Sequence, residues 1–344
     1  MLFRQTSRSL TVLAPAKLNL FLRIVGKRAD GFHDLESVMA TISVYDTLVL
    51  DVCPSSEIEL SVVDASMRMM SGSMRLEAPV GPKNLVIRAA NLLRERTGCR
   101  DGARITLIKR IPSSAGLGGG SSDCAAALAG LNRLWNLRLP RAELLVQAGE
   151  LGSDVPFFLA DTPMAVCTGR GEQIEPLRCS THLHFVVAKP ASGLSTPAVF
   201  RRWSSVQAEL NTNSLREQGR GKSSNPETVR SHSASLLTQR VGVDELDVLD
   251  SPTMASFVEC LTQRDVGATA RRLHNGLQAP AETLNADVRQ MRKLFERLPV
   301  IGHQMSGSGS SYFGICVSRR QALGVASRLK AAGVPWVQAV QICP

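Results

Sequence analysis

The sequence predicts an α+β protein built from two halves. Three observations lead to this fold class. Segments with strand-like alternation are interspersed with segments of helical periodicity, the pattern starts again near residue 183, and a glycine-rich loop joins a strand to a helix in the first half. With 344 residues, 44% of them hydrophobic and 20% charged, the chain is long enough for one large domain or two moderate ones.

In the first half, four segments show the alternation of apolar and polar residues that is typical of a strand. They are 11–24, 46–53, 56–63 and 103–111. In the first of them Leu18, Leu20 and Leu22 point to one face, while Lys17 and Asn19 point to the other. Because the leucines belong in the core, Lys17 and Asn19 are expected to face water or a cleft.

Three segments of the first half have the periodicity and end signals of helices. They are 84–98, 122–135 and 141–152. Asn84 is suited to cap the first helix and Gly98 to end it. The second helix is rich in alanine and directly follows the glycine-rich loop.

The second half is expected to begin with a strand at 183–190. Helices are expected near 254–274, 281–297 and 319–332, and strands after the loop "MSGSGSS" and at 335–342. We place the domain boundary at roughly 160–182, giving units 1–165 and 166–344. Residues 204–245 are polar, with few large apolar groups, and are interpreted as a mobile surface insertion.

The net charge of +10 favours anionic partners, either nucleic acid or phosphorylated small molecules, although scattered solvated arginines give the same total. The eight cysteines lie at least five positions apart, which excludes redox CxxC motifs and the usual zinc spacing. Isolated cysteines indicate a reducing compartment, so a cytoplasmic location is expected. No signal peptide and no apolar run long enough to span a membrane is recognised.

The stretch "IPSSAGLGGGSSDCAAAL" at 111–128 is the strongest local signal in the sequence. Glycines let backbone N–H groups approach a ligand closely, and a helix N-terminus attracts phosphate. A flexible turn is the simpler alternative, but the position between a strand and a helix favours phosphate binding. Gly120 is followed by Ser121 rather than lysine, which excludes a P-loop, and Ser121 also breaks the dinucleotide fingerprint.

Phosphoryl transfer needs a group that takes the proton of the acceptor, together with compensating positive charge. Asp154 in "GSDVPFF" and Lys17 are the candidates. Each also has an ordinary structural interpretation, Asp154 as a helix N-cap and Lys17 as a solvated strand residue. Only the combination with the glycine-rich loop favours catalysis.

Five stretches resemble the GHMP small-molecule kinases, namely "PAKLNLFL", "GFHDLESVM", "PSSAGLGGGSSD", "GSDVPFFL" and "SGSGSSYFGI". The resemblance extends over about residues 12–342 but does not cover the segment 204–245. The resemblance implies a two-domain fold, with a ribosomal-protein-like N-terminal domain and a ferredoxin-like α/β C-terminal domain. The active site would lie in the cleft between them. Within this family the motifs match the branch that phosphorylates the 2-hydroxyl of 4-diphosphocytidyl-2-C-methyl-D-erythritol in isoprenoid biosynthesis.

The resemblance also implies roles for individual residues. Asp154 would be the general base, Lys17 its charge partner and Asn19 a ligand of the methylerythritol. ATP, with Mg²⁺ bridging its phosphates, would be bound by the glycine-rich loop and two further residues. These are Pro112, Ser113, Ser114, Ala115, Gly116, Leu117, Gly118, Gly119, Gly120, Ser121 and Ser122, with Asn84 and Lys109.

The second substrate would be held by residues from both halves of the chain. Phe32, His33 and Phe200 would form a cytosine pocket, because aromatic rings stack on bases. Thr196 and the second loop would complete the site, the loop residues being Ser306, Gly307, Ser308 and Gly309. No residue is assigned as a protein ligand of the metal.

The partners expected are therefore two small molecules, ATP and the diphosphocytidyl compound, with no nucleic acid and no membrane, in a monomer or homodimer. Another GHMP kinase, acting on mevalonate or homoserine, is the main alternative and would have no cytosine pocket. An RNA-binding module is disfavoured by an aromatic content of 4% and the lack of a basic stripe. An inactive paralogue is disfavoured by the presence of Lys17, Asp154 and the glycine-rich loop.

Overall fold

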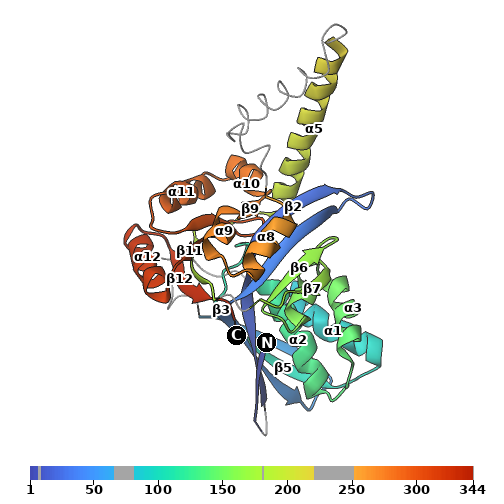
Figure 1. Ribbon diagram of the computed structural model, residues 1–344. Coiled ribbons are helices and arrows are strands. Elements are labelled where there is room, and N and C mark those ends of the chain that lie inside the picture. Colours follow the sequence, from blue (N-terminus) through green and yellow to red (C-terminus); the bar gives the residue numbers. More distant parts are fainter. Residues whose placement is uncertain (7–8, 66–80, 180–181, 221–251, 344) are drawn as a thin grey trace.

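The computed structural model describes residues 1–6, 9–65, 81–179, 182–220 and 252–343, and the side chains of these except for 211–220. The chain forms two β-sheets with helices packed against them, as expected for the α+β class (Figure 1). The two described chain ends lie near each other in this view, at the lower side of the molecule.

The first sheet is built mainly from the first half of the chain. Its central order is β1-β2-β3-β5-β4, with β6 paired to β3, β7 to β6 and β9 to β2. The strands are β1 (Leu2–Gln5), β2 (Ser9–Lys27), β3 (His33–Cys53), β4 (Ile58–Asp64), β5 (Gly102–Lys109), β6 (Met164–Thr168), β7 (Gln173–Pro176) and β9 (His274–Asn275).

The antiparallel hairpin of β2 and β3 runs through the whole molecule and is drawn in blue in Figure 1. The second strand is longer than the expected 46–53, because residues 33–45 continue the pairing with β2. The register shifts between Asn19 and Phe21, and such bulges re-aim side chains. Both faces of this part of β2 are covered: Lys17 is 4% exposed and Asn19 is 1% exposed.

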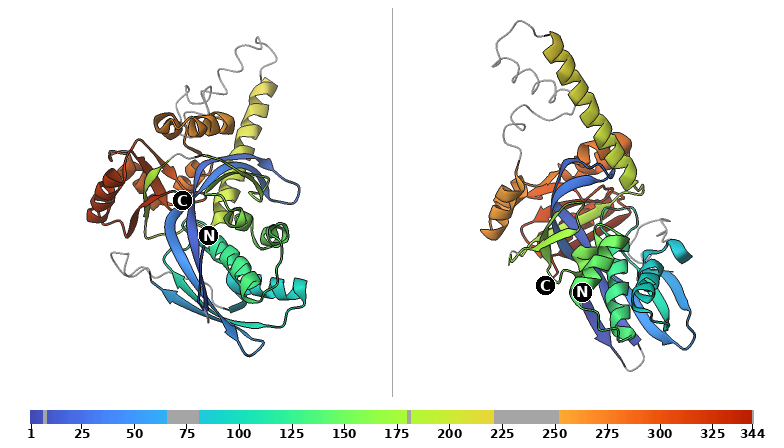
Figure 2. Two further views of the ribbon diagram at one scale, coloured as in Figure 1. Left: turned by 60° about the horizontal axis from the view of Figure 1, so that its bottom comes forward. Right: turned by 90° about the vertical axis from the view of Figure 1, so that its right-hand side faces the viewer.

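Helices of the first half cover one face of this sheet (Figures 1 and 2). They are α1 (Leu85–Thr97), α2 (Gly119–Leu134), α3 (Arg141–Leu151) and the short α4 (Val155–Leu159), with a 3₁₀ turn at Gly81–Lys83. Asn84 caps α1 through a hydrogen bond from the Val86 N–H, and Gly98 ends it in the left-handed conformation, as predicted. Ala125, Ala126 and Ala127 of α2 are fully buried and allow this helix to lie close to β2 and β3.

The second sheet has the order β10-β11-β8-β12, with every neighbouring pair antiparallel. Its strands are β8 (His184–Lys189), β10 (Gly302–Met305), β11 (Tyr312–Cys316) and β12 (Trp336–Gln341). The surrounding helices are α8 (Met254–Thr262), α9 (Val266–Arg271), α10 (Gln278–Leu284), α11 (Ala286–Phe295) and α12 (Arg319–Ala331).

The helix expected at 254–274 is two helices, since Arg264 between them has a φ of 59°. The helix expected at 281–297 is also divided. Asn285, in an extended conformation, ends α10 and caps α11.

The expected boundary at 165–166 falls inside β6. Because β6 and β7 pair with the first sheet, the chain passes from the first sheet to the second between Pro176 and His184. The polar segment expected to begin at 204 starts within a helix, α5 (Thr196–Arg220), which projects from the body in Figure 1. Its remainder, 221–245, lies outside the described residues.

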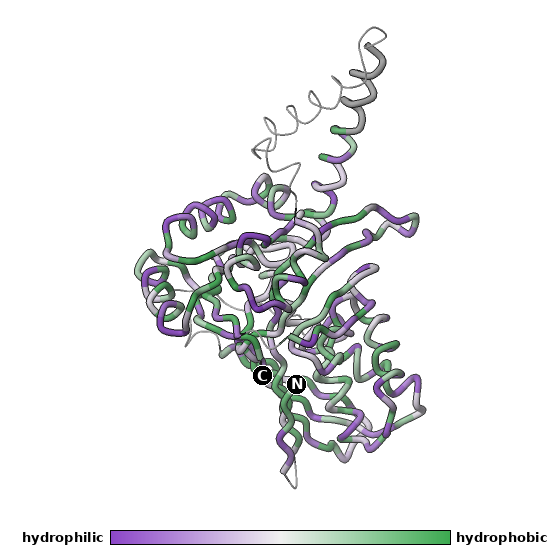
Figure 3. The backbone as a smooth tube through the Cα atoms, viewed as in Figure 1, coloured by the Kyte–Doolittle hydropathy of each residue, from purple (hydrophilic) through white to green (hydrophobic). Residues whose placement is uncertain are grey.

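Hydrophobic residues follow the strands of both sheets, and hydrophilic residues recur along the outer helices (Figure 3). One core cluster joins the two halves, since Leu18 and Leu20 of β2 belong to the same cluster as Phe313 and Trp336 of the second sheet. Among the described residues, no helix is both long and apolar enough to cross a membrane.

Candidate active site

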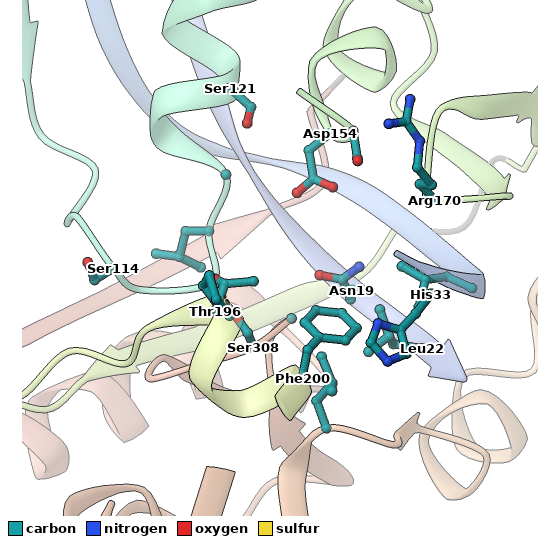
Figure 4. Close-up of a pocket in the computed structure, with 18 of the residues that line it drawn as sticks. Asn19, Leu22, His33, Ser114, Ser121, Asp154, Arg170, Thr196, Phe200 and Ser308 are labelled. Atoms are coloured by element: carbon teal, nitrogen blue, oxygen red, sulfur yellow. Dashed lines mark hydrogen bonds between the residues drawn. The ribbon is translucent and has the colours of Figure 1, made fainter. Parts of the chain in front are cut away.

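A cavity of about 960 Å³ lies between the glycine-rich loop, the β2–β3 hairpin and the first turns of α5. The side chains that surround it come from distant parts of the chain (Figure 4). Lys17 and Asp154 are among its lining residues, and Lys17 Nζ lies 3.4 Å from Asp154 Oδ2. The structure therefore brings together the two residues that the sequence suggested as a pair.

Asp154 immediately precedes α4, the position of an N-cap. Its side chain nevertheless makes no capping hydrogen bond, so the ordinary structural interpretation does not apply. The carboxylate instead points into the cavity, where it is one-third exposed (Figure 4). Val155 and Phe157 behind it are buried and fix the position of the turn.

Lys17 is held by a buried network on β2. Its ammonium donates a hydrogen bond to Asn19 Oδ1. The Asn19 amide nitrogen donates to Ser37 Oγ at 2.8 Å, and Ser37 in turn donates to the Phe21 carbonyl. These bonds leave neither Lys17 nor Asn19 free to rotate, so the ammonium is fixed beside Asp154.

Two glycines of the loop, Gly116 and Gly118, are required by close packing within the protein, whether or not a ligand is bound. A Cβ at Gly116 would lie 2.0 Å from the Ser306 carbonyl oxygen, and one at Gly118 would lie 2.9 Å from the Lys17 side chain. Both glycines also have positive φ, 72° and 69°. The loop thus lies directly on Lys17 and on the second glycine-serine loop.

The N-terminus of α2 opens into the same cavity. Gly119, Gly120 and Ser121 form its first turn and line the cavity, and Gly118 before them has no side chain that could cap the helix. The first N–H groups of a helix lack partners within the helix and carry the positive end of its dipole. This turn is therefore suited to bind phosphate oxygens.

Aromatic side chains gather at the other end of the cavity. The rings of His33 and Phe200 have centroids 5.0 Å apart, and Trp203 meets His33 edge-on. The His33 Nε2 atom lies 2.9 Å from Ser204 Oγ. Burial, together with the charge of Lys27, lowers the pKa of His33, which favours a neutral imidazole. Phe32 also lines the cavity but is half exposed.

The second glycine-serine loop closes the cavity from the side of the second sheet. Gly307 and Ser308 line the cavity, and Ser308 Oγ lies 2.7 Å from Thr196 Oγ1 (Figure 4). Ser306 is fully buried and bonds to the Gly116 carbonyl, so it joins the two loops. Gly309 is not among the lining residues.

Asn84, Lys109 and Ser122 were expected at the nucleotide, and the structure places none of them among the lining residues. Asn84 caps α1, and Ser122 is fully buried within α2. Lys109 lies beneath the loop, where Asp123 Oδ2 is 2.6 Å from its ammonium and Asp46 also accepts a hydrogen bond. Burial alone would lower the pKa of Lys109, but these two carboxylates raise it overall.

Among the described residues, no group of three or more metal-binding side chains is found. Asp123 is the one carboxylate close to the glycine-rich loop in sequence, and it is buried and paired with Lys109. Ser121, with its side chain at the cavity, remains as a hydroxyl that can approach a metal ion carried by a nucleotide.

Several lining residues were not predicted from the sequence, and three polar ones among them are Arg170, Arg201 and Ser204. A local sequence feature could have indicated Arg170 as a site residue, because it stands between two glycines in "TGRGE". Arg201 and Ser204 had none, because the helix α5 that carries both of them was not predicted from the sequence.

Comparison with known proteins places this chain in a family. A model of the GHMP kinases N terminal domain matches residues 84–166, and a model of the GHMP kinases C terminal domain matches 257–335. The 4-diphosphocytidyl-2-C-methyl-D-erythritol kinase of Pelotomaculum thermopropionicum is 35% identical over 321 residues, covering 93% of this chain and 94% of the relative. The enzyme of the same name from Acaryochloris marina is 32% identical over 326 residues, covering 94% and 92%.

Solved structures of GHMP kinases also match this chain. A crystal structure of 4-(cytidine 5'-diphospho)-2C-methyl-D-erythritol kinase matches with a TM-score of 0.68 and 30% identity, covering 96% of this chain and 98% of that one. A homoserine kinase from Cytophaga hutchinsonii, with a TM-score of 0.66 at 15% identity and coverages of 100% and 97%, shares the fold. The chain belongs to the GHMP kinases and, within them, to the family of 4-diphosphocytidyl-2-C-methyl-D-erythritol kinases.

Proposed function

We propose that this enzyme transfers the γ-phosphoryl group of ATP to the 2-hydroxyl of 4-diphosphocytidyl-2-C-methyl-D-erythritol. The observation that carries the proposal is that one cavity contains three kinds of group. A phosphate-binding helix end, the Lys17–Asp154 pair and an aromatic cluster around His33 all line it. Each matches one part of the reaction, namely the nucleotide, the reacting hydroxyl and the pyrimidine base.

Asp154 is proposed as the general base. The acceptor hydroxyl gives its proton to the carboxylate while its oxygen forms a bond to the γ-phosphorus. The bond between that phosphorus and the β,γ-bridging oxygen breaks, ADP leaves, and the proton passes from Asp154 to solvent. Lys17, fixed 3.4 Å from the carboxylate, supplies positive charge where negative charge develops in the transition state.

The phosphates of ATP are proposed to bind at the first turn of α2. Gly119, Gly120 and Ser121 offer backbone N–H groups there, and the helix dipole adds a partial positive charge. The packing of Gly118 against Lys17 fixes the distance between this turn and the reacting centre. The γ-phosphoryl group would accordingly be delivered next to Lys17.

Mg²⁺ is proposed as an ion carried by the nucleotide, which fits a site where Asp123 is already paired with Lys109. Ser121 is the side chain that would approach the ion. When bound, Mg²⁺ neutralises charge on the phosphates during transfer.

The base of the second substrate is proposed to stack at Phe200 and Phe32 and to hydrogen-bond with His33. A neutral imidazole has one donor and one acceptor, and the Ser204 hydroxyl beside Nε2 restricts how the ring can turn. Asn19 and Thr196 are proposed to contact the methylerythritol, because both lie in the cavity between the base end and the loops (Figure 4).

A coupled assay of ADP release tests the proposal. We expect turnover with 4-diphosphocytidyl-2-C-methyl-D-erythritol and none above background with mevalonate or homoserine, and competitive inhibition by CDP against the diphosphocytidyl substrate. Turnover of mevalonate or homoserine without inhibition by CDP would contradict it and would indicate a different acceptor.

A further inference from the structure

Arg170 is a cation at the cavity that the proposed mechanism does not use. It lies in the turn Thr168–Gly171 between β6 and β7, which is closed by a hydrogen bond of 3.0 Å from the Gly171 N–H to the Thr168 carbonyl. Gly169 and Gly171 have φ values of 68° and 109°, conformations that side chains other than glycine adopt with strain. These glycines hold the turn in a shape that places Arg170 at its tip.

The turn is fixed next to both ends of the substrate site. On one side the Leu35 N–H donates to the Gly169 carbonyl at 2.7 Å, two residues from His33. On the other side a Cβ at Gly171 would lie 3.8 Å from Asp154 Oδ1. Arg170 is therefore held between the base end and the catalytic carboxylate, and Figure 4 draws all three along one side of the cavity.

Neighbouring side chains orient the guanidinium group of Arg170 but leave its N–H donors available to a ligand. Its Cζ atom lies 4.9 Å from the centroid of the Phe32 ring, a cation–π contact. Its one ion pair within the described chain is to Glu172, at 3.6 Å, which is longer than a hydrogen bond. The side chain is 29% exposed, so its donors remain accessible to a ligand.

The charges that line the cavity are strongly unequal. Four of the lining side chains are cationic, and Asp154, already paired with Lys17, is the one carboxylate among the described lining residues. The cations are Lys17, Lys27, Arg170 and Arg201. An excess of positive charge between a base-binding end and a reacting end fits a substrate with phosphates in the middle.

We propose that Arg170 binds the diphosphate of the cytidine diphosphate portion of the substrate, with its stacking on Phe32 setting the guanidinium in place beforehand. A planar guanidinium binds phosphate oxygens with paired, charge-assisted hydrogen bonds. Arg170 would then determine specificity for a nucleoside diphosphate over an unphosphorylated nucleoside. This inference rests on the proposed function, because it assumes that a cytidine diphosphate enters the cavity.

Calorimetric titration of the intact protein with cytidine, CMP and CDP separates the roles of Arg170. For Arg170→Gln we expect the Kd of CDP to rise about 10- to 100-fold, since a hydrogen bond to a charged group is lost, while the Kd of cytidine changes by less than about twofold. Arg170→Lys should restore part of the CDP affinity. KM for the diphosphocytidyl substrate should rise with kcat nearly retained. Arg104→Gln, an exposed arginine on β5 paired with Glu59, is the matched control.

Two results would overturn the inference. Equal losses for cytidine and CDP would mean that Arg170 only supports Phe32, and unchanged affinity for CDP would mean that it does not contact the diphosphate. A wild-type protein that neither binds CDP nor turns over the diphosphocytidyl substrate would instead refute the proposed function. Thermal unfolding of each variant shows whether the fold is retained.

Discussion

Lys17 Nζ lies 3.4 Å from Asp154 Oδ2, although Lys17 comes from β2 and Asp154 from the turn before α4. The Lys17 ammonium donates a hydrogen bond to Asn19, and Gly118 of the glycine-rich loop packs against the aliphatic part of the lysine side chain. The pair is thus built by three separate segments that meet at one point of the cavity. Its role can be tested through each partner.

Asp154→Asn is expected to lower kcat by about 10²- to 10⁴-fold, because the amide has nearly the same shape but cannot take the proton. The Kd of ATP, measured by calorimetry, should stay within about twofold. Near wild-type kcat in this variant would show that another group is the base.

Lys17→Met is expected to lower kcat by about 10²- to 10³-fold, because the charge fixed beside Asp154 is lost. Steady-state kinetics with both substrates measure the effect. Arg23→Gln, on the same strand but at the surface and paired with Glu36, is the control and should keep kcat. If both variants behave alike, the effect reflects disturbance of β2 rather than chemistry.

Phe200→Ala is expected to weaken binding of CDP by about 1–3 kcal/mol, the usual contribution of one aromatic ring stacked on a base. Affinity for ADP should not change, because the phosphate-binding turn of α2 is at the other end of the cavity. Phe3→Ala, an aromatic of β1 stacked with Arg133 outside the cavity, provides the comparison. Equal effects on CDP and ADP would argue against a separate base site.

Lys109→Met is expected to reduce the free energy of unfolding by about 3–5 kcal/mol, since it leaves Asp46 and Asp123 buried without their cation. Urea unfolding measures this loss. Lys330→Met on the exposed side of α12 should change stability by less than about 0.5 kcal/mol. A Lys109 variant as stable as the control would show that these ion pairs do not stabilise the fold.

Acid is expected to destabilise the protein through His274 and His303. Burial, the largest cause in each case, lowers both pKa values below that of an unfolded histidine. The unfolded chain therefore binds more protons, so the free energy of unfolding falls as pH decreases from about 6.5 through the lowered values. Urea midpoints at pH 7.5 and 5.5 test this. His303→Gln should reduce the difference between them, whereas the exposed His182→Gln should not.

The family and the pairing of Lys17 with Asp154 were accessible from sequence because the motifs that carry the resemblance are local. The resemblance to the GHMP kinases is confirmed by the relatives and by the family models. The glycine-rich loop and α2 lie where the sequence placed them, since their signals are local. The roles of Lys17 and Asp154 in the reaction remain predictions, to be decided by the variants above.

Other features depend on pairing that no local pattern contains. Residues 33–45 are extended because β2 lies alongside them, and β6 and β7 join the first sheet although they follow its helices. The family resemblance implied that Lys109 lies at the nucleotide, and no local sequence signal distinguishes a lysine that binds a ligand from one in a buried ion pair. Its two carboxylate partners, Asp46 and Asp123, come from different elements.

The core cluster that Leu18 and Leu20 share with Phe313 and Trp336 has a consequence for motion. Gln304 of β10 also donates hydrogen bonds to the carbonyls of Asn19 and Leu20, so the two sheets are joined next to the strand that carries Lys17. A hinge that swung the halves apart would have to break this joint. Entry of substrates and exit of ADP are therefore better served by small movements at the rim, in the hairpin tip near Phe32 and the start of α5, than by opening of the molecule.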